Sequence, residues 1–256
     1  MPGIAPTMAD EFQAGSDAMD GDRPFRRSFT AETDVPAFQT ALREVLTVCG
    51  VALDTIQIAQ LVKHYHLLGE TNTYLNLTRL IGPAEAARWH YLDILAALPC
   101  FTGNMPTWWV DVGSGGGFPG LPLAVARPAW RLVLAERRAK KAAFLRRCVS
   151  ELGLTGRVQV HAGEFEPGTA LRVLADCGVD VSRETFGLLA RAVEDGPKKL
   201  PRLLRLSPFV SAAFWLGQAD AEALVRQRLP GWRVHPLYHL PTGAQRVVSI
   251  LTRRAD

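Results

Sequence analysis

A glycine-rich segment holds the residues of this 256-residue sequence that point most directly to ligand chemistry. Residues 111–120 read Asp-Val-Gly-Ser-Gly-Gly-Gly-Phe-Pro-Gly and follow a run of strand-forming residues that begins at Trp108. Glycines let the backbone turn sharply and let a ligand approach where a Cβ atom would collide. Open α/β sheets bind ligands at the carboxyl ends of their strands, so this loop is a candidate binding site. It is not a P-loop, because no Gly-Lys-Ser/Thr follows.

Two classes of nucleotide ligand remain open for this loop. Gly115, Gly117 and Gly120 match the Gly-x-Gly-x-x-Gly pattern of dinucleotide-binding folds. Glu136 follows Gly115 by 21 residues, where a carboxylate can accept both hydroxyls of an adenosine ribose. Asp111 favours S-adenosylmethionine, because a carboxylate at the end of the first strand repels a pyrophosphate but suits a sulfonium and an ammonium group. A glycine turn that holds no ligand is the third interpretation.

The glycine segment, together with other segments in the same order, resembles the signature of the RsmG (GidB) family. Enzymes of that family methylate N7 of a single guanine in small-subunit ribosomal RNA. The segments that carry the resemblance are Tyr74–Thr78, His90–Asp93, Asp111–Ala124, Glu136, Lys140–Leu145 and Arg191–Ala192. The resemblance covers roughly residues 53–253. It implies an S-adenosylmethionine-dependent methyltransferase that acts on 16S ribosomal RNA or on the small ribosomal subunit.

The resemblance also implies two sets of site residues. The set expected to hold S-adenosylmethionine is Asp111, Gly113, Gly115, Phe118, Glu136, Glu164, Phe165 and Arg191. The set expected to be catalytic is Arg191, Asp93, Asn76 and His90, with Thr78 beside them. Arg191 is expected to position both the cofactor and the acceptor base, and Asp93 to stabilise the cationic product. The alternative for His90 and Asp93 is a local i,i+3 pair on a helix.

Some positions depart from the family pattern. Trp89 stands where the family usually has Arg, and residues 163–165 read Gly-Glu-Phe where it has Arg-x-Glu. His64 and His66 match no motif, and we expect both to be ordinary helix residues. Three alternatives therefore stay open: a catalytically silent homologue that binds ribosomal RNA, a methyltransferase with another acceptor, and an NAD-dependent oxidoreductase.

Alternating strands and helices must position these residues. Strand-like runs are expected at residues 108–112, 131–135, 157–160, 186–191, 209–216 and 246–252, with an amphipathic helix from 142 to a stop at 153. This alternation predicts an α/β fold with a doubly wound, mostly parallel sheet over residues 107–256. The family resemblance identifies it as a Rossmann-like class I methyltransferase core.

An N-terminal helical subdomain is expected at residues 37–98. Helical stripes begin at Phe38 and at Ile58, the first stopped by Gly50 and the second capped by Asp54 with Gln57 three residues later. A third helix is expected from Pro83 to about residue 98. Residues 1–36 are acidic and weakly periodic, which predicts a disordered tail.

Charge and composition limit the class of protein. Residues 1–36 carry a net charge of −4, which leaves +8 for the rest. Eight basic residues and one acid lie between Arg127 and Arg147, and four more basic residues between Lys198 and Arg205, which we expect to contact phosphates. No apolar run is long enough for a membrane span. Four scattered cysteines argue against a zinc site. We expect a cytoplasmic monomer without a metal or a membrane partner.

Overall fold

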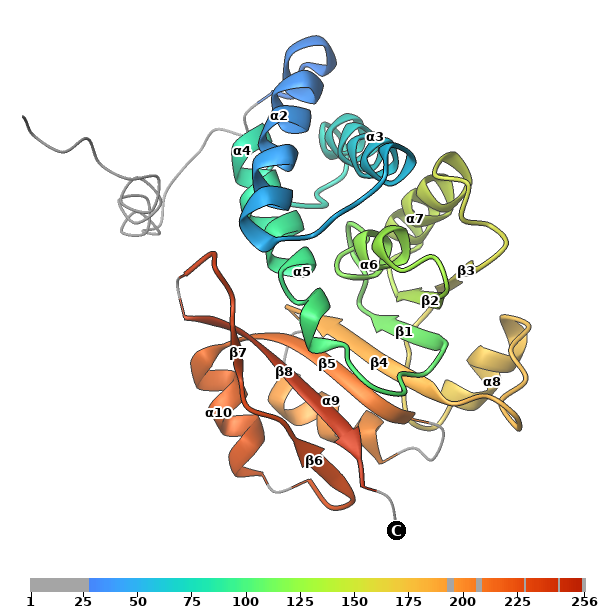
Figure 1. Cartoon of the computed structure of the whole chain (residues 1–256). Coiled ribbons are helices and arrows are strands. Elements are labelled where there is room, and N and C mark those ends of the chain that lie inside the picture. The colour runs from blue at the N-terminus through green and yellow to red at the C-terminus, as the bar shows by residue number, and fades with distance from the viewer. Residues whose placement is uncertain (1–27, 193–195, 206–208, 228, 244, 255–256) are drawn as a thin grey trace, which may run out of the picture.

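The computed structural model describes residues 28–254 apart from 193–195, 206–208, 228 and 244, and within these ranges a mixed β-sheet carries helices on both faces (Figure 1). Most of the predicted acidic tail, residues 1–27, lies outside the described residues. Within the part of the chain that the structure covers, no helix has the length and apolar character needed to cross a bilayer.

Within the described residues the sheet has eight strands, five of which run parallel. They are β1 (Trp108–Val112), β2 (Arg131–Glu136), β3 (Val158–Ala162), β4 (Phe186–Arg191), β5 (Phe209–Gly217), β6 (Trp232–Val234), β7 (Tyr238–His239) and β8 (Arg246–Arg253). Their spatial order is β3-β2-β1-β4-β5-β8-β6, with β7 also paired to β8. β1 to β5 are parallel and β8 is antiparallel to its neighbours. The predicted doubly wound, mostly parallel sheet is confirmed; the short β6 and β7 were not predicted.

Helices form a layer on each face of the sheet. The bounds are α2 (Ala31–Cys49), α3 (Thr55–Asn72), α4 (Pro83–Ala86), the π-helix η1 (Ala87–Leu92), α5 (Asp93–Leu95), the 3₁₀ turn η2 (Leu98–Cys100), α6 (Gly120–Ala126), α7 (Ala139–Glu151), α8 (Ala170–Asp176), α9 (Gly196–Leu204) and α10 (Gln218–Arg226). Figure 1 shows α2 to α7 on one side of the sheet and α8 to α10 on the other. α8 lies in a stretch for which the sequence predicted no element.

Alternating side chains divide the core into two layers. Trp109 and Leu132 point into a hydrophobic cluster that also contains the buried residues of α2 to α7. Trp108, Val110 and Val133 point to the opposite face and pack against α8, α9 and α10. This is the period of two that a strand imposes on its side chains. The helical segment therefore shares one core with the sheet and does not form a separate one.

Local capping signals set several helix ends. The Asp54 carboxylate accepts a hydrogen bond from the Gln57 amide, and the Gln57 side chain accepts one from the Asp54 amide, so the predicted capping box is present. Gly50 ends α2 with a left-handed φ of 63°. However, α2 begins at Ala31, before the predicted start. Its first turn is held by the Asp34 carboxylate, which accepts from the Thr30 amide at 3.1 Å, so the prediction that residues 31–36 belong to a disordered tail is wrong.

The third predicted helix is not continuous. Residues 83–100 form α4, the π-helix η1, α5 and a 3₁₀ turn in succession. A π-turn places one extra residue in the turn and so changes the direction of the side chains that follow it, and such turns are common at functional sites. Here η1 carries His90, and Asp93 follows it directly.

Candidate active site at the ends of β1 and β4

The two central strands end beside each other at the carboxyl edge of the sheet. The chain runs from β1 outward to β2 and β3, and then returns to β4 on the other side of β1. Val112 pairs with Ala190, so the glycine loop after β1 and Arg191 at the end of β4 leave the sheet side by side. A reversal of strand order is the position at which open α/β sheets bind their ligands. The fold therefore brings the glycine loop and Arg191, one segment from each predicted set, to this edge.

Backbone hydrogen bonds to β2 and left-handed glycines set the conformation of the glycine loop. The amides of Gly113 and Ser114 both donate to the carbonyl oxygen of Ala135 on β2, at 2.9 and 3.1 Å. Gly113, Gly115 and Gly117 have left-handed φ values of 74°, 55° and 91°, which side chains disfavour. A Cβ atom on Gly117 would also lie 2.4 Å from Leu121 Cδ1. The loop conformation therefore requires these glycines.

Glu136 joins this loop to the end of β2. Its buried carboxylate accepts a hydrogen bond from the Gly115 amide at 3.0 Å through Oε2, and another from the Arg138 amide at 2.8 Å through Oε1. A carboxylate offers about four lone-pair sites, so acceptor capacity remains on both oxygens. The arrangement fits a ligand with vicinal hydroxyls, such as an adenosine ribose, at the place where the sequence predicted one.

Asp111 lies underneath the loop and is fully buried. Its Oδ2 accepts from the Gly120 amide at 3.0 Å, which ties the start of α6 to the end of β1. Its Oδ1 has no hydrogen-bond partner. Burial raises the pKa of Asp111 to about 7. A buried, unpartnered carboxylate oxygen is costly, and a cationic ligand group near the loop would offset that cost.

His90 and Phe118 form the opposite wall of the site. Their rings stack, with centroids 4.7 Å apart. His90 Nδ1 lies 3.3 Å from the Arg191 guanidinium, which can only donate, so Nδ1 is the acceptor and Nε2 donates to Thr78 Oγ1 at 2.9 Å. Burial, together with the charge of Arg191, lowers the pKa of His90 well below its usual value. His90 is therefore a neutral imidazole that fixes the orientation of Arg191.

Asp93 is the centre of a buried charge cluster. Its carboxylate accepts from Arg191 at 3.2 Å, from Arg246 at 2.7 Å and from the Thr242 hydroxyl at 2.7 Å. Arg191 also donates to the carbonyl oxygen of Trp89. Burial raises the pKa of Asp93, although the two guanidiniums oppose the rise, and burial lowers the pKa of Arg191 to about 10. These contacts hold Arg191 rigidly at the end of β4.

His90 and Asp93 are not the local pair that was the alternative for them, because both contact Arg191 from β4 instead. Arg246 and Thr242 complete the charge cluster, but no motif or spacing in the sequence indicated them. They come from β8 and the turn before it, about 150 residues after Asp93. A contact over that distance along the chain leaves no trace in local spacing.

Three predicted residues do not join the two walls of the site. Asn76 is exposed on the loop after α3. Glu164 is also exposed and lies 3.6 Å from the Arg137 guanidinium. Phe165 is buried in the second core cluster, with its ring 6.3 Å from that of Phe209. Contacts of these three residues with a cofactor or an acceptor base stay predictions.

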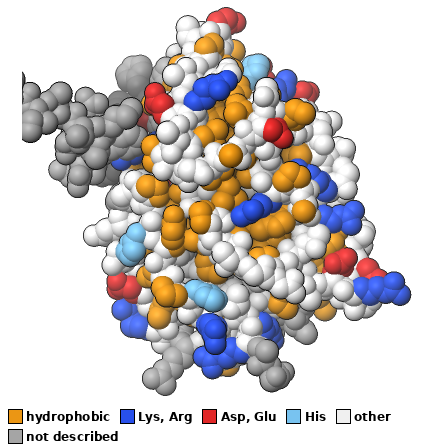
Figure 2. All heavy atoms as spheres, viewed as in Figure 1, with side chains coloured by type: hydrophobic (Ala, Val, Ile, Leu, Met, Phe, Trp, Pro, Cys, Tyr) orange, Lys and Arg blue, Asp and Glu red, His pale blue; other side chains and the backbone are white. Residues whose placement is uncertain are grey.

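The basic cluster before and along α7 contains both structural and solvated cations. Arg127 donates to the Leu98 carbonyl, and Arg147 pairs with Glu70 at 2.9 Å. Arg138, Lys140 and Arg146 are exposed to solvent. Figure 2 shows hydrophobic side chains gathered along the middle of the face that carries α2 to α5, with Lys and Arg side chains spaced around them. Of these exposed cations, Arg138 and Lys140 lie at the start of α7, directly after the end of β2 at Glu136.

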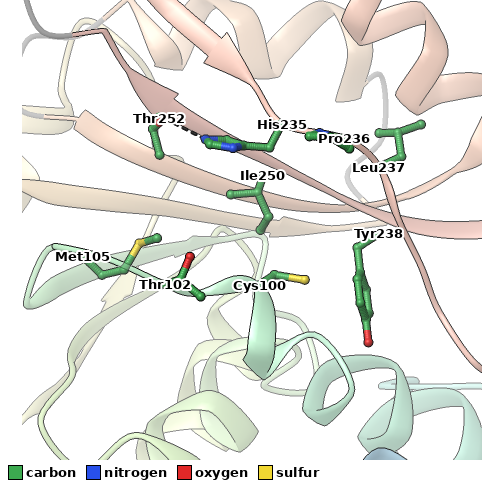
Figure 3. A pocket seen from close by; sticks show the side chains of 9 residues that line it. All are labelled: Cys100, Thr102, Met105, His235, Pro236, Leu237, Tyr238, Ile250 and Thr252. Carbon is green, nitrogen blue, oxygen red and sulfur yellow. Dashed lines mark hydrogen bonds between the residues drawn. The ribbon is translucent and has the colours of Figure 1, made fainter.

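A cavity of about 290 Å³ lies elsewhere in the molecule, between the segment before β1 and the strands β7 and β8. Figure 3 shows Cys100, Thr102 and Met105 on one side of it and Tyr238 and His235 on the other. None of the predicted site residues lines this cavity. Among the described residues no group of three or more His, Cys, Asp or Glu side chains is arranged to hold a metal ion.

The sequence of this chain is similar to one family of known proteins. The sequence profile of the family described as GidB, rRNA small subunit methyltransferase G, matches residues 57–183. A ribosomal RNA small subunit methyltransferase G from Solibacter usitatus is 35% identical over 199 residues, which are 75% of this chain and 90% of that protein.

Two further relatives of the same name match over shorter stretches. The protein from Pelotomaculum thermopropionicum is 40% identical over 149 residues, 57% of this chain and 58% of that protein. The one from Laribacter hongkongensis is 42% identical over 114 residues, 44% of this chain and 54% of that protein. The chain thus spans little more than half the length of these two relatives. The match to the Solibacter usitatus protein, which spans 75% of this chain and 90% of that protein, shows that the chain belongs to the ribosomal RNA small subunit methyltransferase G family.

Proposed function

We propose that this protein transfers the methyl group of S-adenosylmethionine to N7 of a guanine in 16S ribosomal RNA. The observation that supports this most strongly is the joining of two sets of residues at the ends of β1 and β4. We call the glycine loop with Asp111 and Glu136 the cofactor side. We call His90, Asp93 and Arg191 the acceptor side. Phe118 belongs to the loop and stacks on His90, so it connects the two sides.

The residues of the cofactor side suit S-adenosylmethionine. The remaining lone pairs of Glu136 would accept the ribose hydroxyls, and the bare backbone of Gly113 and Gly115 leaves room for the ligand. Burial raises the pKa of Asp111 to about 7, and a ligand that carries a sulfonium and an ammonium group would favour the ionised form of its unpartnered carboxylate. When bound, this cofactor supplies a methyl group on a positively charged sulfur. A dinucleotide suits the site less, because Asp111 would lie near its pyrophosphate.

The acceptor side needs to position a base and not to deprotonate it. Guanine N7 has a free lone pair and carries no proton, so the reaction requires no general base. Holding the reacting atoms about 3–3.5 Å apart and aligned can lower a barrier by roughly 7–11 kcal/mol. The neutral His90 ring and the anchored Arg191 are suited to that task, because neither is free to rotate.

We assign Asp93 an electrostatic role in the proposed methyl transfer. Methylation at N7 makes the guanine cationic, and an isolated guanidinium close to it would repel the product. Asp93 lies 3.2 Å from Arg191 and 2.7 Å from Arg246, and it offsets part of their positive charge. We propose that Asp93 acts in this way, through Arg191, and also favours the developing positive charge.

Phosphate contacts are proposed for the exposed cations at the start of α7 and on α9. Helix N-termini carry partial positive charge and favour acids, yet the first turn of α7 contains Lys140 and Lys141 and no acid, and the start of α9 contains Lys198 and Lys199. Both helices follow strands that end at the site. Cations in such places are explained by an anionic partner, and RNA affinity should then fall steeply with salt. We further propose that the protein works as a cytoplasmic monomer without a metal.

The test is transfer of a labelled methyl group from S-adenosylmethionine to small ribosomal subunits that lack the modification. Naked 16S RNA is the second substrate, and Arg191→Lys and Arg191→Ala are the variants, each checked by thermal melting. We expect the labelled methyl group on N7 of one guanine, and we expect the rate of transfer to fall at least about a hundredfold in Arg191→Ala. Cofactor binding without transfer would favour a silent RNA-binding homologue or another acceptor, and binding of NADH would favour an oxidoreductase.

A further inference from the structure

His64 lies directly beneath the glycine loop, although it belongs to no motif. Its side chain is fully buried on α3. Its Nε2 lies 2.9 Å from the carbonyl oxygen of Gly116, and its Nδ1 lies 2.9 Å from the hydroxyl of Tyr91. A carbonyl oxygen can only accept, so Nε2 carries the proton and Nδ1 accepts from Tyr91. Burial lowers the pKa of His64 to about 4, so the ring is neutral at physiological pH.

The imidazole fills the space under the turn. A Cβ atom on Gly117 would lie 3.1 Å from His64 Nε2, which is closer than such atoms normally approach. The Phe118 ring centroid lies 5.0 Å from that of His64. The residue thus contacts three successive positions of the loop, and its hydrogen bond holds the peptide group that joins Gly116 to Gly117.

Tyr91 connects this support to the acceptor side. It follows His90 in η1, and the two residues reach the loop by different routes. His90 stacks on Phe118 from the side, and Tyr91 donates to His64, which donates to Gly116. The same turn of π-helix therefore orients both the neighbour of Arg191 and the support of the glycine loop.

We infer that His64 is a positioning residue for S-adenosylmethionine, which holds the Gly115–Gly117 turn in its binding conformation through the Tyr91–His64–Gly116 hydrogen bonds. This inference rests on the proposed function, since it assigns a support to the proposed cofactor loop. His64 does not touch the reacting atoms, so its removal should weaken cofactor binding far more than it changes the rate at saturating cofactor.

The experiment compares His64→Leu, His64→Gln and a matched control in the full chain. Gln places an amide N–H close to the position of Nε2, whereas Leu keeps similar bulk without a donor. We expect the dissociation constant of S-adenosylhomocysteine, measured by calorimetry, to rise roughly tenfold in His64→Leu, as for one lost buried hydrogen bond, and to return to within about threefold in His64→Gln. The control is His66→Gln, because His66 is partly exposed and pairs with Glu70; it should bind as the wild type does.

A folded His64→Leu variant with wild-type affinity would overturn the inference while leaving the proposed function intact. A wild-type chain that binds neither S-adenosylmethionine nor S-adenosylhomocysteine would overturn both. The tautomer provides a test that needs no stable Leu variant. Nitrogen-15 spectra of the wild-type histidine rings, assigned with His64→Gln, should show His64 protonated on Nε2, with a signal that shifts when S-adenosylhomocysteine is added. Protonation on Nδ1, or a signal that does not respond, would contradict the inference.

Discussion

The cofactor side and the acceptor side of the site draw their residues from very different lengths of chain. Asp111, the glycine loop and Glu136 lie within two neighbouring strands and the loop between them, and backbone amides make most of their contacts. His90 and Asp93 come from the helical segment, Arg191 from β4 and Arg246 from β8. Contacts between side chains from these separate elements hold most of the acceptor side together.

This difference predicts different responses to substitution. On the cofactor side, a substituted carboxylate loses only hydrogen bonds to backbone amides of one loop, so this side should lose ligand affinity and largely keep its fold. A buried carboxylate between two guanidiniums supports several elements at once, so its loss should destabilise the protein. Substitutions on the two sides should therefore separate these two responses.

Asp93→Ala should have the largest effect, because it leaves Arg191 and Arg246 without their carboxylate. Removing one partner of a buried ion pair typically costs about 3–5 kcal/mol, and the free energy of unfolding should fall by that order in urea denaturation. Thr242→Val removes only one hydrogen bond to the same carboxylate and should cost about 1 kcal/mol. Equal losses in the two variants would contradict the central role of the charge.

Glu136→Gln should affect binding more than folding. The amide can keep one backbone contact but loses the charge that strengthens bonds from ribose hydroxyls, a change of roughly 1.5–3 kcal/mol. The dissociation constant for S-adenosylmethionine should therefore rise about tenfold to a hundredfold, with little change in melting temperature. A fall in stability as large as that of Asp93→Ala would remove the contrast between the two sides.

Asp111 should make stability depend on pH. Its folded-state pKa of about 7 lies above its ordinary value, so the folded protein binds a proton that the unfolded chain has released. The stability linked to this group is present at acid pH and is lost as the pH rises toward 7. The free energy of unfolding should fall by on the order of 1 kcal/mol per pH unit between about pH 5 and 7. Asp111→Asn should flatten that slope; an unchanged slope would assign it to another group.

Asn76→Ala and Glu164→Gln should have the smallest effects on folding, within about 0.5 kcal/mol, because both side chains are exposed. If the family resemblance holds at these positions, Asn76→Ala lowers the rate of methyl transfer and Glu164→Gln weakens cofactor binding. Single-turnover transfer and calorimetry measure the two effects. A wild-type result for either would remove that residue from the site.

Much of the fold followed from local pattern. The strands that carry the site, the capping box of Asp54 and Gln57, and the stop at Gly50 lie where the sequence predicted them. Such features depend on residues a few positions apart, and their physical causes act within one turn or one strand. The early start of α2 shows the limit of this approach. An acidic, weakly periodic stretch predicted no helix there, yet the Asp34 carboxylate stabilises the first turn of α2.

The sequence by itself determined the place of the glycine loop and of Glu136, since the order and spacing of the glycines and of an acid one strand later indicate both. The family resemblance named His90, Asp93 and Arg191, but only the tertiary structure decided how they meet. The π-turn at residues 87–92, the burial of His64 under Gly116 and the meeting of Asp93 with Arg191 and Arg246 depend on packing between segments up to about 150 residues apart. A buried charge or imidazole is stable only where distant partners surround it, and no local pattern records those partners.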